Sequence, residues 1–141
     1  MKSFLCTAAG AVGTFIAAAL GGWDSAIIAL LTFMAIDYAT GLMVAGIFHK
    51  SKKSTSGGLE SRAGFKGLVR KCVVLLLVVV ANLLDQQMGA NYIRDAVCIG
   101  FMANELLSIV ENASLMGLPI PAAITKALDI LTEKQEGTAN G

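Results

Sequence analysis

The sequence predicts an all-α integral membrane protein with four short hydrophobic helices followed by a C-terminal amphipathic helix. Hydrophobic residues make up 55% of the 141 residues, charged residues only 15%, and the mean hydropathy is +0.69. Soluble domains lie nearer 45–50% apolar and about 25% charged. The apolar residues form long runs with no strand-like alternation. We therefore expect one membrane domain over residues 1–131, with three spans and one interfacial helix as the alternative.

The first hydrophobic segment, residues 4–20, is rich in Ala and Gly. Only Lys2 precedes it, a weak n-region for a signal peptide, so we expect a retained helix. Small residues recur every four positions, a pattern that lets helices approach closely in lipid. Self-association is the favoured interpretation, and a generic Ala-rich helix without a partner is the alternative. The close-packing candidates are Ala9, Gly13, Ala17 and Gly21, with Gly41 on the next segment.

The second segment, residues 26–48, is the clearest span, because a helix of this length covers roughly 34 Å. Its apolar side chains outweigh one charge, so its insertion free energy is roughly −1 to −2 kcal/mol. That charge is Asp37, and an intramembrane acid is a functional hypothesis by default. We expect either an interhelical contact that responds to ionisation or a local hydrogen bond to Thr40 or Tyr38.

A basic stretch follows at residues 49–67, and we expect it to be a cytoplasmic loop. Phe65 is its only aromatic residue, so the interleaved stacking typical of nucleic-acid binding is absent. Anionic headgroups are the expected partner. The third segment, residues 68–84, would be short, and its first basic residues would extend towards the interface. The candidate headgroup-binding residues are Lys50, Lys52, Lys53, Arg62, Lys66, Arg70 and Lys71.

The fourth segment, residues 96–112, has an insertion free energy near zero or above, so it needs partners, water or a protonated Glu105. At 100° per residue its polar side chains fall within an arc of about 120°. We expect this stripe to line a pore or contact another copy. A helix lying in the interface and ordinary internal packing are the alternatives. The stripe consists of Asn104, Glu105, Ser108, Glu111 and Asn112.

Pro119 and Pro121 break the chain, and apolar residues at helical spacing then predict an amphipathic helix over residues 119–131. Residues 132–141 form a polar tail that we expect to be loose. Of the eleven Lys and Arg residues, only Arg94 lies outside if the basic loop is cytoplasmic and all four segments cross. The positive-inside rule therefore favours cytoplasmic termini.

No motif for phosphate binding, metal coordination or nucleophilic catalysis occurs, so we expect neither an enzyme nor a cofactor. The three cysteines, Cys6, Cys72 and Cys98, are single and lie in or beside apolar runs. We interpret them as small apolar residues.

Several stretches resemble the holins, small membrane proteins of phage lysis and toxin secretion. They are Asp37-Tyr38-Ala39-Thr40-Gly41, residues 56–71 with Gly64, Gly67 and Lys71, residues 104–112, and Gly117-Leu118-Pro119-Ile120-Pro121. The resemblance covers roughly residues 30–125. It implies a homo-oligomer that opens lesions in the bacterial cytoplasmic membrane and lets an endolysin or a toxin leave. The competing interpretations are a small proton-coupled multidrug transporter and a non-pore scaffold or lysis antagonist.

Overall fold

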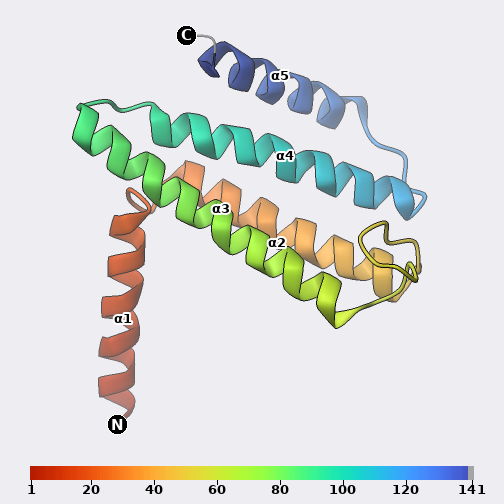
Figure 1. Ribbon diagram of the computed structural model, residues 1–141, viewed down its shortest axis with the longest axis horizontal. Coiled ribbons are helices and arrows are strands. Elements are labelled where there is room, and N and C mark those ends of the chain that lie inside the picture. The colour runs from red at the N-terminus through yellow and green to blue at the C-terminus, as the bar shows by residue number, and fades with distance from the viewer. Residues whose placement is uncertain (140–141) are drawn as a thin grey trace.

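The protein is all-helical in a computed structural model that describes the backbone of residues 1–139 and the side chains of residues 1–137. In Figure 1, α2 to α5 lie alongside one another and α1 projects away from them. No strand occurs in the described residues, as the sequence predicts. The helices are α1 (Lys2–Ala19), α2 (Ser25–Gly46), α3 (Ser61–Met88), α4 (Ile93–Leu115) and α5 (Ala122–Ala139).

Three helices, α1, α2 and α3, are long and apolar enough to cross a membrane, and α4 is not among them. This agrees with the marginal insertion free energy expected for the fourth segment. The weakest candidate is nevertheless the central helix, because α4 packs against α2, α3 and α5. Its neighbours cover much of the polar surface that α4 would otherwise present to lipid.

The α3 helix is longer than the sequence suggested. It begins at Ser61, seven positions before the expected residue 68, and ends at Gly89, whose φ of 64° is left-handed. The loop is therefore shorter than the predicted 49–67, and its basic residues from Arg62 onward are helical. Lys and Arg are good helix formers with long apolar stems, so the helix continues beyond its hydrophobic run.

The C-terminal helix also extends beyond its predicted end. Residues 132–139 continue α5 rather than forming a loose tail, and residues 140 and 141 lie outside the described part of the chain. Leu128 and Leu131, two apolar residues of α5 at helical spacing, are half-buried, and Leu128 lines a pocket together with residues of α4. Gly100 gives α5 close access, because a Cβ there would lie 3.1 Å from the Gln135 side-chain nitrogen.

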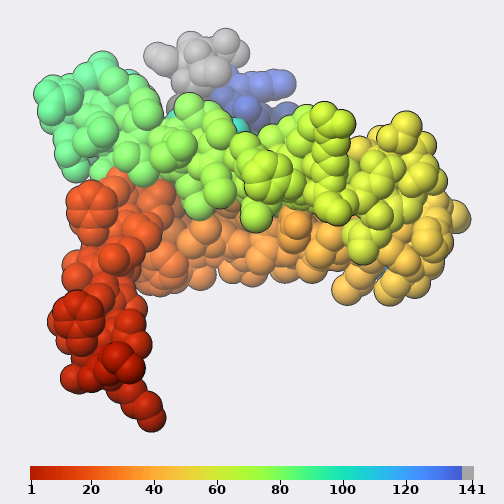
Figure 2. All heavy atoms as spheres, turned by 60° about the horizontal axis from the view of Figure 1, so that its bottom comes forward, coloured from red at the N-terminus to blue at the C-terminus, as the bar shows by residue number. Residues whose placement is uncertain are grey.

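The core lies between α2, α3 and α4. Ile27, Leu30, Val78 and Cys98 are fully buried in it. The α1 helix contributes no buried residue, and Figure 2 shows it standing clear of the body of the molecule. A Cβ added at Gly13 would meet nothing within 4 Å. The small-residue face of α1 is therefore open in the single chain.

Candidate functional site: a charge cluster between α2, α3 and α4

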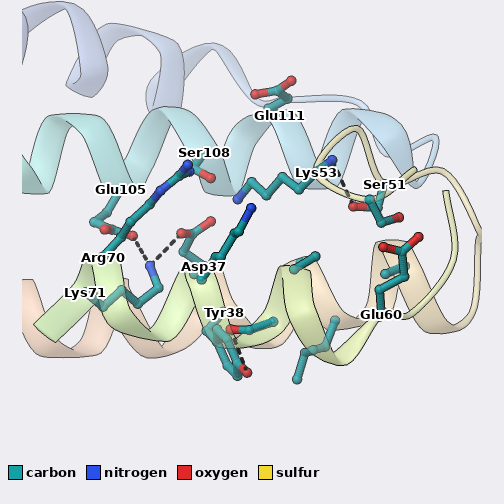
Figure 3. Close-up of a pocket in the computed structure, with 18 of the residues that line it drawn as sticks. Asp37, Tyr38, Ser51, Lys53, Glu60, Arg70, Lys71, Glu105, Ser108 and Glu111 are labelled. Carbon is teal, nitrogen blue, oxygen red and sulfur yellow. Dashed lines mark hydrogen bonds and ion pairs between the residues drawn. The ribbon is translucent and has the colours of Figure 1, made fainter. Parts of the chain in front are cut away.

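Three charged side chains from three helices meet inside the bundle. The Lys71 ammonium on α3 lies 2.7 Å from a carboxylate oxygen of Asp37 on α2 and 2.7 Å from one of Glu105 on α4. The Lys71 side chain is 14% exposed and each acid 7%. Figure 3 shows the two dashed contacts. We call Lys71, Asp37 and Glu105 the charge triad. One ammonium between two carboxylates leaves it a formal charge of −1.

A second polar contact extends the triad along α4. The Asn112 amide nitrogen donates to the Asp37 carboxylate at 3.2 Å and to the Thr40 hydroxyl at 2.9 Å. Asn112 is buried, with 5% of its surface exposed. Gly41 lies beside it, and a Cβ there would be 3.8 Å from the amide nitrogen, an ordinary van der Waals distance. Polar contacts of this kind hold helices together where water is scarce.

The predicted stripe on α4 is thus divided between the inside and the outside of the chain. Glu105 and Asn112 point inward and contact α2 or α3, whereas Asn104 and Glu111 are exposed. Ser108 is half-buried between them. Glu111 pairs with Lys52 at 3.4 Å on the surface. In the single chain, therefore, part of the stripe serves internal packing.

The triad forms the floor of a cavity of about 480 Å³ between α2, α3, α4 and the loop that joins α2 to α3. Hydrogen bonds within the loop fold it over this end of the bundle: the Ser51 amide donates to the Gly57 carbonyl at 2.9 Å, and the Ser54 hydroxyl donates to the Gly58 carbonyl at 2.8 Å. Tyr38 closes one side of the cavity, and its hydroxyl lies 3.5 Å from the Gly64 carbonyl oxygen.

Lys71 was predicted to bind headgroups, but in the structure its ammonium lies inside the bundle, paired with Asp37 and Glu105. It lies one turn beyond Gly67 and two turns beyond Gly64, on the α3 face that packs against α2 and α4. Small residues at these two positions let the helices approach, so the ammonium reaches the acids. The other predicted headgroup residues, Lys50, Lys52, Lys53, Arg62, Lys66 and Arg70, are exposed.

The opposite end of the bundle contains a charge cluster that was not predicted. Arg94, only 6% exposed, donates to both carboxylate oxygens of Asp24 at 2.8 and 3.1 Å and to the Leu20 and Gly22 carbonyls. Gly21 fits beneath it with a φ of 90°, and a Cβ there would lie 2.6 Å from the Arg94 Cδ. Gly21 was predicted to let another helix approach closely. In the structure it is the Arg94 side chain that approaches Gly21.

The start of α4 is fixed at the same end. Asp85 near the end of α3 accepts from the backbone amides of Ile93 and Arg94 at 3.0 and 2.9 Å. Arg94 itself was the sequence signal for this cluster. It is the one basic residue expected on the outer side of the membrane, and it stands between the acidic residues Asp85 and Asp95. Its hydrogen bonds tie the α1–α2 turn, α3 and α4 together.

Two carboxyl groups outside the helices have altered acidity. Hydrogen bonding from Arg94 holds the pKa of Asp24 below its ordinary value, against the opposing effect of burial. Hydrogen bonds from the Ser56 backbone and side chain likewise lower the pKa of Glu60. Both acids are therefore ionised at neutral pH, and Asp24 also begins α2 by accepting from the Ile27 amide at 3.1 Å.

Comparison with known proteins gives a consistent family. A model described as the bacteriophage holin family matches residues 14–133. A probable holin of Bacillus phage phi105 is 36% identical over 118 residues, which cover 78% of this chain and 82% of that protein. Uncharacterized proteins of Halalkalibacterium halodurans (33% identical, 93% of this chain and 96% of the relative) and Clostridium perfringens (34%, 92% and 93%) are also similar. No solved structure matches.

Proposed function

The chain belongs to the bacteriophage holin family, and on that premise we propose that it oligomerises in the bacterial cytoplasmic membrane and opens lesions there. The cargo would be an endolysin or a toxin, which crosses to the cell wall without binding the protein tightly. The N-terminus and the basic connection between α2 and α3 would be cytoplasmic. Gln135 of α5 lies beside Gly100 of α4 in the single chain, so a cytoplasmic C-terminus would require α5 to leave α4 in the membrane.

One observation carries the proposal: α4, the hydrophobic segment with the marginal insertion free energy, is held in place by polar contacts to α2 and α3. Glu105 and Asn112 of α4 are satisfied by Lys71 and Asp37. Exposing either group to lipid without a partner costs free energy, whereas water can satisfy the hydrogen bonds of both. A state that hides the polar face of α4 and a state that lines a water-filled lesion with it are both physically acceptable. That is what a protein needs if it is to accumulate harmlessly and then open.

The α1 helix supports the assembly step. Its apolar surface is almost wholly unpartnered within the described residues, and Phe4, Leu5, Val12 and Phe15 are more than half exposed. Its small-residue rows offer another copy close backbone contact. We therefore assign oligomer contacts to Ala9, Gly13 and Ala17 of α1, and pore lining to Asn104, Ser108 and Glu111, with Glu105 and Asn112 joining them once the triad opens.

Inducible expression in a bacterium tests the proposal and separates its competitors. We expect sudden loss of viability with leakage of a folded cytoplasmic reporter. Drug resistance in intact cells would instead indicate a transporter, and survival without either effect a scaffold or antagonist. Replacing Glu105 and Glu111 by Leu should abolish or retime killing at unchanged membrane levels. Unchanged lysis timing would remove the α4 stripe from the mechanism.

A further inference from the structure

The charged side chains of the cavity beside the triad are unevenly paired, in a way that the lesion-forming function does not explain. Its lining includes four acids and four bases. The acids all have partners: Lys71 contacts Asp37 and Glu105, Lys52 contacts Glu111, and Ser56 donates to Glu60. Among the four lining bases, Lys71 is the one with an ion-paired partner in the described part of the chain.

The three remaining cations are Lys53 from the loop and Lys66 and Arg70 from α3. Within the described residues, none of these three side chains has a hydrogen-bonded or ion-paired partner. All three line the same cavity. Figure 3 shows Lys53 extending from the loop over the cavity and Arg70 reaching across it towards Ser108 on α4. Side chains from two separate segments therefore converge on one space.

We propose that this cavity binds the phosphate of an anionic phospholipid headgroup, held by Lys53, Lys66 and Arg70. Arg presents a planar fork of donors that matches phosphate geometry, and the two ammonium groups add charge. The Ser108 hydroxyl and Ser54 are further polar groups in the lining. The phosphate would lie away from the triad, because the triad carries a formal charge of −1 and repels a second anion.

The neighbouring surface favours a lipid over a soluble phosphate compound. Leu42, Leu59 and Leu107 line the cavity together with the polar groups. They are 39%, 64% and 52% exposed, so apolar surface continues outward from the phosphate-binding side chains. An acyl chain can follow that surface while the headgroup lies among the cations. Bound lipid would join the loop, α3 and α4, and so stabilise the state in which the α4 stripe is hidden. The inference uses only the membrane placement in the proposed function and does not require lysis.

Lipid retention by the purified full-length protein tests this binding directly. The protein is incorporated into nanodiscs of equal phosphatidylglycerol and phosphatidylcholine, re-extracted in detergent at about 1 M salt, and its retained lipid is measured by mass spectrometry. At that salt the Debye length is about 3 Å, so attraction to exposed lysines is screened. We expect retained phosphatidylglycerol, and at least a tenfold loss in the variant K53Q/K66Q/R70Q. The matched control K2Q/K50Q/R62Q removes three exposed charges that neither line the cavity nor pair with its acids, and should retain lipid as the native protein does.

A charge-neutral variant keeps the test valid if removal of three cations prevents folding. Ala63→Phe narrows the cavity without altering any charge, and it should also lower phosphatidylglycerol retention at least tenfold. Equal losses in the cavity and control variants would overturn the proposal and assign binding to general surface charge. So would native protein that binds inorganic phosphate in detergent but retains no phosphatidylglycerol. Cells that fail to lyse while the purified protein keeps the lipid would refute the lesion function and leave the lipid site standing.

Discussion

Lys71 is the residue on which the internal order of the bundle depends most. Its ammonium forms ion pairs with both the Glu105 and the Asp37 carboxylates, and Asn112 also donates to the Asp37 carboxylate. A buried ion pair adds little compared with apolar residues, but removing one partner leaves an uncompensated charge.

We expect Lys71→Met to lower the free energy of unfolding by about 3–5 kcal/mol, because two carboxylates then face each other without a cation. The measurement is a denaturant titration in detergent. The triple variant D37N/K71M/E105Q removes every charge and should recover most of the loss. An equally unstable triple variant would show that packing at Lys71, not charge, is what matters. Arg62→Met, which alters an exposed cation outside the cavity, is the control.

Asp24 gives the fold a dependence on pH. Arg94 lowers the folded-state pKa of Asp24, so its contribution to stability is complete above pH about 4 and is lost as pH falls through the depressed folded pKa. We expect the thermal midpoint in detergent to fall more steeply between neutral and acid pH in the native protein than in Asp24→Asn. Asn is also a good N-cap residue, so this variant removes the charge and keeps the cap. Parallel curves for the two proteins would contradict the assignment.

At the scale of the helices, much was predictable and the exceptions have physical causes. The marginal free energy of the fourth segment followed from its own residues, and α4 is indeed the helix that lies among partners. The start of α3 was missed because hydropathy reports where apolar residues lie, not where a helix begins. The ion pairs of Lys71 were missed for a related reason: the direction of its side chain depends on α3 extending back through Gly64. The small-residue spacing at Gly64 and Gly67 was the available signal.

The α1–α2 turn shows how a single glycine fixes the junction of two helices. Both Gly21 and Gly22 have positive φ, of 90° and 107°, but only at Gly21 would an added Cβ meet Arg94 and Asn82. We expect Gly21→Ala to lower the free energy of unfolding by about 1–3 kcal/mol more than Gly22→Ala does, because both variants strain the backbone and only one overpacks. Equal effects in a denaturant titration would mean that backbone strain alone requires glycine here.

The open face of α1 makes a separate prediction about association. Gly13→Leu adds a bulky side chain where nothing lies within 4 Å in the single chain, so the fold should be unaffected. Close approach of a second α1 would be blocked, and we expect cross-linked oligomers in membranes to decrease severalfold. Ala8→Leu, about 140° round the helix, is the matched control and should cross-link normally. Loss of oligomers in both variants, or in neither, would count against this face.

At the scale of the whole molecule, the bundle combines one well-anchored end with one adaptable end. Arg94 and Asp85 tie the outer turns to α3 and α4 through several hydrogen bonds. The other end depends on the charge triad and on the loop over the cavity. If the protein opens as we propose, we expect opening to begin at the triad, where water can replace the contacts of Glu105 and Asn112 while the Arg94 end stays together. Family and helix count were readable from the sequence, but this difference between the two ends required the contacts.

The central claim is that the inward part of the polar face of α4, from Glu105 through Ser108 to Asn112, is shielded before lysis and faces water afterwards. Accessibility of a cysteine at Ser108 tests it most directly, in a background where Cys6, Cys72 and Cys98 are replaced by Ala. Membranes are isolated before and after the onset of lysis and opened so that a charged thiol reagent reaches both sides. Ser108→Cys should label slowly before lysis and at least tenfold faster afterwards, while Leu106→Cys on another face of α4 stays unreactive. Labelling of Ser108→Cys that does not change at the onset of lysis would contradict the claim.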